Sequence, residues 1–77
     1  MRRKQPVLVE LGHKIRALRI KRGLSQEAFA DLVDLDRSYM GRIERGENNT
    51  TVLNIYRIAR ALHIAPAKLF PNRLPPI

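Results

Sequence analysis

The sequence predicts an all-α fold, a compact domain of five helices. In several segments apolar residues recur at three- and four-residue steps, which places them on one face of a helix. No segment alternates apolar and polar residues in the way that a half-buried strand does. A chain of 77 residues has room for one domain with one modest core.

The first two helices are expected between residue 7 and about residue 33. Gly23 ends the first helix, and Ser25 precedes the second, because a serine oxygen can accept a hydrogen bond from the free amides of a first turn. Glu27 suits the positive end of the second helix dipole. The apolar positions on the inner face of the first helix are Val7, Leu8, Leu11, Ile15 and Leu18.

Asp36 is the predicted N-cap of a third helix, which spans residue 37 to about residue 45 and stops at Gly46. Thr51 caps the fourth helix. Pro66 fits the first turn of a last short helix that runs through Leu69 and Phe70. The inner stripe expected for the fourth helix consists of Val52, Ile55, Ile58, Ala59 and Leu62.

Three regions follow from this pattern: a basic arm at 1–6, a helical domain at 7–70 and a proline-rich tail at 71–77. The chain has no cysteine, which excludes a disulfide framework and a cysteine zinc site and suits a reducing cytoplasm. No apolar segment approaches membrane-spanning length, so no membrane partner is expected.

The net charge of +8, from 15 basic and seven acidic residues, makes nucleic acid the first partner to consider. No metal, cofactor or enzymatic activity is expected. His13 and His63 lie in different predicted helices with no carboxylates at metal-ligand spacing, and no residues suggest a catalytic triad or an acid and base pair.

The third predicted helix has an apolar inner face and a cationic outer face. Met40 and Ile43, with Leu35 before the helix, point inward. A guanidinium matches the paired acceptors of guanine in the major groove, and phosphates flank both grooves. The outward residues are Arg37, Ser38, Gly41, Arg42 and Arg45. The alternative is a solvated helix face.

At this point the sequence resembles the helix-turn-helix family of phage repressors and Cro proteins, which includes the small controller proteins of restriction-modification systems. The strings LSQEAFA, RSYMGRIERGE and RIARALHI carry the resemblance, which runs from about Leu11 to Phe70. One departure is Asp34, where the family usually has glycine. Because aspartate tolerates the left-handed conformation, the turn is expected to survive. The motif spans residues 26–45, with the expected apolar or small residues at Phe29, Ala30, Val33, Leu35, Met40 and Ile43.

The resemblance implies a DNA-binding role for several residues. The positions that reach base edges are Arg37, Ser38, Tyr39 and Arg42, and those that face phosphates are Gln26, Arg45, Asn48, Asn49 and Thr50. Tyr39 has the alternative of packing against the second helix, and Ser38 that of bonding its own backbone. The resemblance also implies a buried structural ion pair between Arg19 and Glu44.

A homodimer is expected, because the C-terminal part carries more apolar surface than one small core needs. The residues assigned to the dimer interface are Tyr56, Ile64, Phe70, Leu74 and Ile77. The alternative is that Ile64 and Phe70 close the monomer core, while Leu74 and Ile77 belong to a disordered tail.

The expected function is a sequence-specific regulator, a repressor or controller, that binds a pseudo-palindromic operator in double-stranded DNA as a dimer through the major groove. The alternative is an antitoxin or adaptor whose main partner is a protein. RNA binding ranks third, since the chain lacks an aromatic stacking platform. The basic arm Arg2-Arg3-Lys4 either reaches a minor groove or is a solvated terminus.

Overall fold

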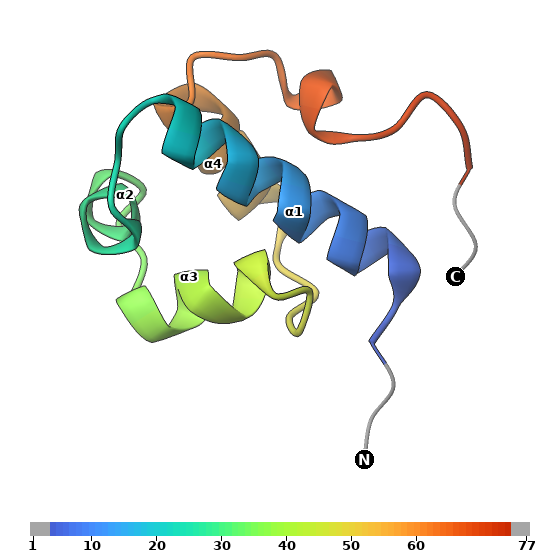
Figure 1. Ribbon diagram of the computed structural model, residues 1–77, viewed down its shortest axis with the longest axis horizontal. Coiled ribbons are helices and arrows are strands. Elements are labelled where there is room, and N and C mark those ends of the chain that lie inside the picture. Colours follow the sequence, from blue (N-terminus) through green and yellow to red (C-terminus); the bar gives the residue numbers. More distant parts are fainter. Residues whose placement is uncertain (1–3, 75–77) are drawn as a thin grey trace.

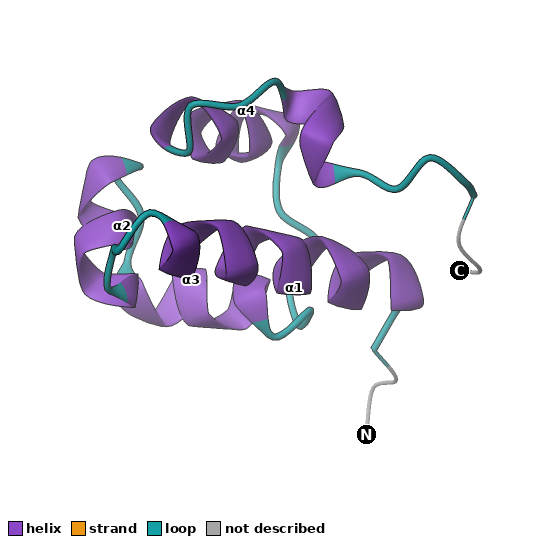
Figure 2. Cartoon of the chain, turned by 45° about the horizontal axis from the view of Figure 1, so that its top comes forward, coloured by secondary structure: helices purple, strands orange, loops and turns teal. Residues whose placement is uncertain are grey.

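The computed structural model describes residues 4–74 and contains only helical elements in that range (Figures 1 and 2). Figure 1 shows α1 lying across the molecule, with α3 below it, α2 at the left and α4 behind it, and α3 packs against both α1 and α2. Residues 1–3 of the predicted arm and residues 75–77 of the tail lie outside the described range. The elements are α1 (Pro6–Lys21), α2 (Gln26–Leu32), α3 (Arg37–Glu44), α4 (Val52–Ala61) and the 3₁₀ helix η1 (Pro66–Leu69).

The prediction of five helices is wrong in one respect, since the described residues form four α-helices and the fifth segment is a single 3₁₀ turn. Phe70, the residue after η1, is extended, with φ −111° and ψ 146°. It directly precedes Pro71, and a residue before proline is driven out of the helical region. Only the four residues from Pro66 to Leu69 are therefore available, too few to propagate an α-helix.

The predicted N-caps of α2, α3 and α4 are confirmed. The Ser25 side chain accepts a hydrogen bond from the Ala28 amide, and the Thr51 side chain accepts one from the Asn54 amide. The Asp36 carboxylate accepts from two amides at the start of α3, those of Ser38 and Tyr39. These are two of the free amides in the first turn of an eight-residue helix, so the cap stabilises much of the helix that carries the predicted DNA contacts.

The turn between α2 and α3 is left-handed at Asp34, where φ is 59°, as expected for the aspartate that replaces the family's glycine. The amide of Leu35 then donates to the carbonyl of Ala30 at 2.9 Å, which ties the turn back to α2. The turn therefore forms without glycine.

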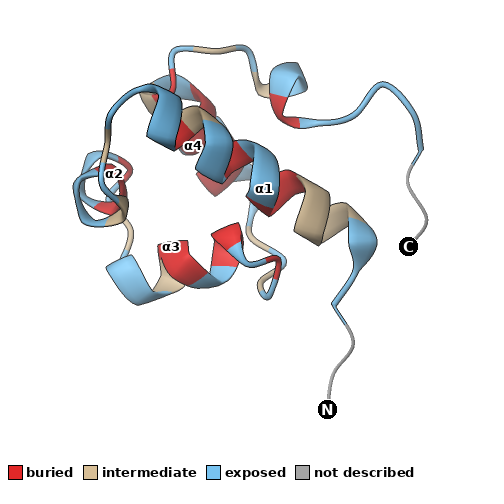
Figure 3. Cartoon of the chain, in the orientation of Figure 1, coloured by how far each residue is buried: buried red, intermediate tan, exposed pale blue. Residues whose placement is uncertain are grey.

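The core draws on every element, and its buried residues face the centre of the molecule (Figure 3). Val52 was predicted to lie on the inner stripe of α4, but 73% of it is exposed. It is the first residue of α4, and the buried part of the stripe starts only at the next turn, with Ile55. The largest fully buried side chains are Phe29, Ile15, Met40, Ile43, Ile58 and Leu69.

Gly12 sets the distance between α1 and α3. A Cβ atom at this position would lie 2.5 Å from the carbonyl oxygens of Ile43 and Glu44, which are backbone atoms of the end of α3. Only a residue without a side chain permits this approach. The contact fixes one face of α3 against α1. The face of α3 that points away from α1 remains accessible.

None of the helices in the described range is long and apolar enough to cross a membrane.

Candidate nucleic-acid interface

The outer face of α3 is cationic and accessible. Met40 and Ile43 are buried beneath it, whereas Arg37, Ser38 and Arg42 are exposed. Leu35 is half-buried and packs against the core from the preceding turn. The helix is thus anchored on its apolar side and presents guanidinium groups on the other.

A shallow hollow on this face brings residues from α2 and α3 together, and we call it the α3 hollow. Gly41 lies at its floor, where an added Cβ would be 3.1 Å from Nη1 of Arg45 and 3.4 Å from Oε1 of Gln26. A flat floor lets another molecule approach the backbone of α3 closely. The lining residues are Gln26, Arg37, Ser38, Gly41, Arg42 and Arg45.

Three of these side chains, those of Gln26, Arg37 and Arg45, contact carboxylates. Gln26 Nε2 donates a hydrogen bond of 3.1 Å to Oε1 of the buried Glu44, which holds the amide at the start of α2. Arg37 Nη1 lies 3.9 Å from Oε2 of Glu27, with both side chains about two-thirds exposed. An ion pair of this length in solvent is weak, so Arg37 is free to exchange it for a phosphate or a base.

Tyr39 and Thr50 contact each other. The Tyr39 hydroxyl lies 3.0 Å from Thr50 Oγ1, and Nδ2 of the buried Asn54 donates to the same Thr50 oxygen, also at 3.0 Å. The Arg42 guanidinium lies over the Tyr39 ring, 5.8 Å from its centre. This series of contacts, which we call the Tyr39 network, links α4 through the loop to a predicted base-contacting arginine.

Sequence reasoning missed Asn54. Its only sequence signal is a polar amide directly before Ile55, next to the buried stripe of α4. A buried amide needs a hydrogen-bond partner, and Thr50 provides it.

Arg45 follows α3 as its C-cap and forms a fork with Glu47, with Nε and Nη2 donating at 3.0 and 3.2 Å. The hydrogen bond from Arg45 lowers the pKa of Glu47 from its ordinary value, and the same bond raises the pKa of Arg45. Lys4 approaches the same carboxylate at 3.8 Å. Asn48 is half-buried and Asn49 exposed, in the loop that follows.

Arg19 and Glu44 meet in the interior between α1 and α3. Arg19 Nε donates to Glu44 Oε2 at 2.7 Å and Nη2 donates to Oε1 at 3.1 Å, and the Glu44 side chain is 2% exposed. Arg19 Nη1 also donates to the carbonyl of Leu24 at 2.8 Å. Within residues 4–74 every buried polar side-chain atom has a hydrogen-bond partner, this pair included.

The residues assigned to a dimer interface do not form one patch. Tyr56 and Ile64 line the same hollow beside α4, whereas Phe70 lines a different one with Glu10 and Lys14 of α1. Leu74 is 98% exposed, and Ile77 lies outside the described range. The structure instead leaves Val52, Leu53 and Tyr56 exposed along α4, with 73, 59 and 59% accessible.

The part of the chain that the structure describes holds no group of three or more histidine or acidic side chains arranged to bind a metal ion. His13 and His63 are both exposed.

Comparison with known proteins identifies the class. Residues 15–69 match the family described as Helix-turn-helix, more than half of the chain, and this chain therefore belongs to that family. Its class is that of DNA-binding helix-turn-helix transcriptional regulators, and the family expected from the sequence is confirmed.

Particular relatives are control proteins. Control protein C.MunI of a Mycoplasma species is 40% identical over 67 residues, which cover 86% of this chain and 90% of the relative. Control protein C.BamHI of Bacillus amyloliquefaciens is 42% identical over 59 residues, covering 75% and 73%. A solved structure, that of the restriction-modification controller protein C.AhdI from Aeromonas hydrophila, is similar with a TM-score of 0.80 at 51% identity, covering 82% of this chain and 96% of that one.

Proposed function

We propose that this protein is a sequence-specific regulator of the controller or repressor type, which binds a pseudo-palindromic operator as a dimer through the major groove. The observation that carries the proposal is the exposed, cationic face of α3 over a buried apolar spine. A helix of this kind fits the major groove, where side chains read base edges. Similarity to proteins named as control proteins supports the same function.

Arg37, Arg42 and Ser38 are the proposed base contacts, since they are exposed on the α3 face. Tyr39 is proposed beside them, through its contact with Arg42. The proposed phosphate contacts are Gln26, Arg45, Asn48, Asn49 and Thr50. Gln26 occupies the start of α2, where a helix amide and a side chain can together hold a phosphate.

The proposed dimer surface is the exposed apolar face of α4, formed by Val52, Leu53 and Tyr56, with Ile64 next to Tyr56. A two-fold dimer places two copies of α3 in successive major grooves about 34 Å apart. An operator with inverted half-sites follows from that symmetry.

The test is selection from random duplexes of about thirty base pairs, long enough for two half-sites, at physiological salt. An enriched inverted repeat is expected. Retention of DNA without any common motif would leave only general electrostatic attraction and would refute the proposal.

The selected operator then separates the roles of two residues. Arg42→Ala is expected to cost about 1–3 kcal/mol of binding free energy and to relax the base preference, because a base contact is lost. Gln26→Ala is expected to weaken binding to all sequences alike, because a phosphate contact carries no sequence information. Identical selectivity profiles for the two variants would contradict these assignments.

A further inference from the structure

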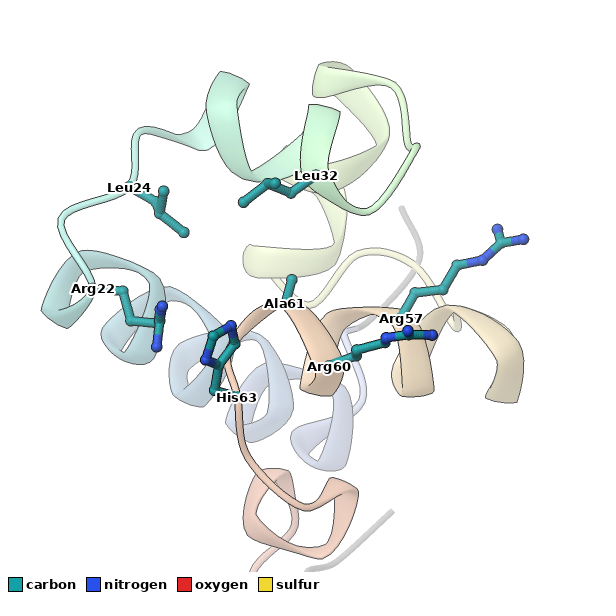
Figure 4. A pocket seen from close by; sticks show the side chains of 7 residues that line it. All are labelled: Arg22, Leu24, Leu32, Arg57, Arg60, Ala61 and His63. Carbon is teal, nitrogen blue, oxygen red and sulfur yellow. The ribbon is translucent and has the colours of Figure 1, made fainter.

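A second basic surface lies where the C-terminal ends of α1, α2 and α4 meet (Figure 4). We call it the basic hollow and define it by Arg22, Leu24, Leu32, Arg57, Arg60 and His63. Three arginines and a histidine line the same space as two leucines, and no acidic residue lines it.

The basic hollow is separate from the α3 hollow. The two share no lining residue. Figure 1 shows the C-terminal ends of α1 and α4 at the opposite edge of the molecule from α3. A DNA duplex held by α3 therefore leaves these arginines unexplained. Arg57 and Arg60 also line the hollow beside Tyr56 and Ile64, so the basic hollow borders the proposed dimer surface.

The charge of the basic hollow is not neutralised within the described residues. Arg22, Arg57 and Arg60 form no ion pair there, unlike Arg37, Arg45 and Arg73. Every acidic residue of the chain lies between positions 10 and 47, so α4 and everything after it contain none.

Helix dipoles account for part of this arrangement. Arg22 is the C-cap of α1, and Arg60 lies in the last turn of α4, where cations are stabilised by the negative helix end. Each helix end carries about half a negative charge, so the three ends that meet here offset about one and a half of the three positive charges. Arg57, one turn earlier in α4, has no such explanation.

The apolar wall adds a second property. Leu32, the last residue of α2, is 62% exposed, and Leu24 is half-buried. Figure 4 shows both leucines on one side of the hollow and the arginines of α4 on the other. An exposed large apolar side chain beside arginines is typical of a surface that contacts another protein.

We propose that the basic hollow docks an acidic segment of a partner protein, with carboxylates on the arginines and an apolar side chain against Leu32. Guanidinium groups bind carboxylates through paired, charge-assisted hydrogen bonds. A phosphate backbone is the poorer occupant, because it offers no apolar group to the leucines. The separation from the α3 hollow allows the protein to hold DNA and this partner together.

The test measures binding of a fluorescein-labelled octapeptide of six glutamates and two leucines by fluorescence anisotropy. The test variant is Arg22→Gln/Arg57→Gln/Arg60→Gln, and the matched control is Arg37→Gln/Arg42→Gln/Arg45→Gln. Each removes three positive charges from the formal net charge of +8. We expect the test variant to weaken peptide binding about tenfold or more and the control variant by less than about threefold. For binding of a duplex DNA, we expect the control variant to lose more affinity than the test variant.

Equal losses of peptide affinity in the two variants would overturn the proposal, because net charge alone would then explain binding. A loss of duplex affinity in the test variant as large as in the control would also overturn it, because the hollow would then bind DNA. Dissociation of the test variant's dimer in sedimentation would overturn it as well, because the hollow would then contact a second copy of the chain.

Leu32→Ser supplies a check that leaves the charge and the core unchanged. It is expected to weaken binding of the leucine-containing peptide about threefold and to leave an octaglutamate peptide unaffected. The same change for both peptides would refute the apolar part of the docking site.

Discussion

Thr50 joins the loop after α3 to both neighbouring helices through one hydroxyl group. Its Oγ1 lies 3.0 Å from the Tyr39 hydroxyl and accepts from Asn54 Nδ2 at 3.0 Å. At the scale of single residues, then, Thr50 has a structural role that competes with the phosphate contact proposed for it.

Thr50→Val is expected to lower the free energy of unfolding by about 1–2 kcal/mol, because the buried Asn54 amide loses its partner. Urea denaturation measures the change. Thr50→Ser keeps the hydroxyl and is the control, with a much smaller loss. Unchanged stability in Thr50→Val together with weaker DNA binding would show that the phosphate role dominates.

Glu44→Ala is expected to destabilise the protein by about 3–5 kcal/mol, because Arg19 would remain as an unpaired charge in the interior. The same substitution at the exposed Glu47 is expected to change the thermal midpoint far less. An unchanged midpoint in Glu44→Ala would show that the buried pair does not stabilise the fold.

Glu47 makes a pH-dependent contribution to the stability of the folded chain. The Arg45 hydrogen bond lowers its pKa in the folded chain, so the contact contributes stability above the pKa of the unfolded chain and is lost as pH falls through the lower folded value. An NMR titration is expected to place the midpoint of Glu47 below that of a free glutamate. Arg45→Gln should return it towards that value, and Lys4→Gln should shift it less. A midpoint unaffected by Arg45→Gln would contradict this cause.

At the scale of elements, one face of α3 packs tightly against α1 and the opposite face is open to solvent. Gly12 of α1 lies against backbone carbonyls of α3, and Gly41 leaves the outer face of α3 without a side chain at that position. The cap at Asp36 fixes where the helix starts. These features position the arginines of α3 without any further structure around them.

The two glycines are expected to respond in opposite ways to alanine. Gly12→Ala places a methyl group 2.5 Å from two backbone oxygens and should cost about 1–3 kcal/mol of stability. Gly41→Ala meets only the ends of flexible side chains and removes a helix-weakening glycine, so stability should hold or rise. Its DNA affinity should fall. Thermal denaturation and operator binding measure both, and a stable Gly12→Ala variant would refute the tight contact.

At the scale of the whole molecule, the exposed apolar face of α4 and the C-terminal tail are separate candidates for dimerisation. Tyr56→Asp is expected to shift the protein towards monomer in sedimentation, because it places a charge on the proposed α4 surface. Truncation after Phe70 is expected to leave the proposed dimer intact, because the exposed apolar residues of the α4 surface, Val52, Leu53 and Tyr56, all precede the cut. A monomeric truncated chain would instead assign the dimer contact to the tail.

The residue pattern by itself determined the four α-helices, three of their N-caps, the left-handed turn at Asp34 and the cationic outer face of α3. These features depend on residues a few positions apart, and local periodicity and capping chemistry act over that range. The family resemblance predicted that Arg19 and Glu44 would meet.

Only the tertiary structure decided the exposure of Val52, the 3₁₀ form of η1, the close approach at Gly12 and the separation of Tyr56 from Phe70. It also decided that Asn54, Thr50 and Tyr39 form one network and that three arginines border a second hollow. The physical reason is that such contacts join segments distant in the chain, and their distances follow from how the helices pack rather than from the spacing of residues along any one of them.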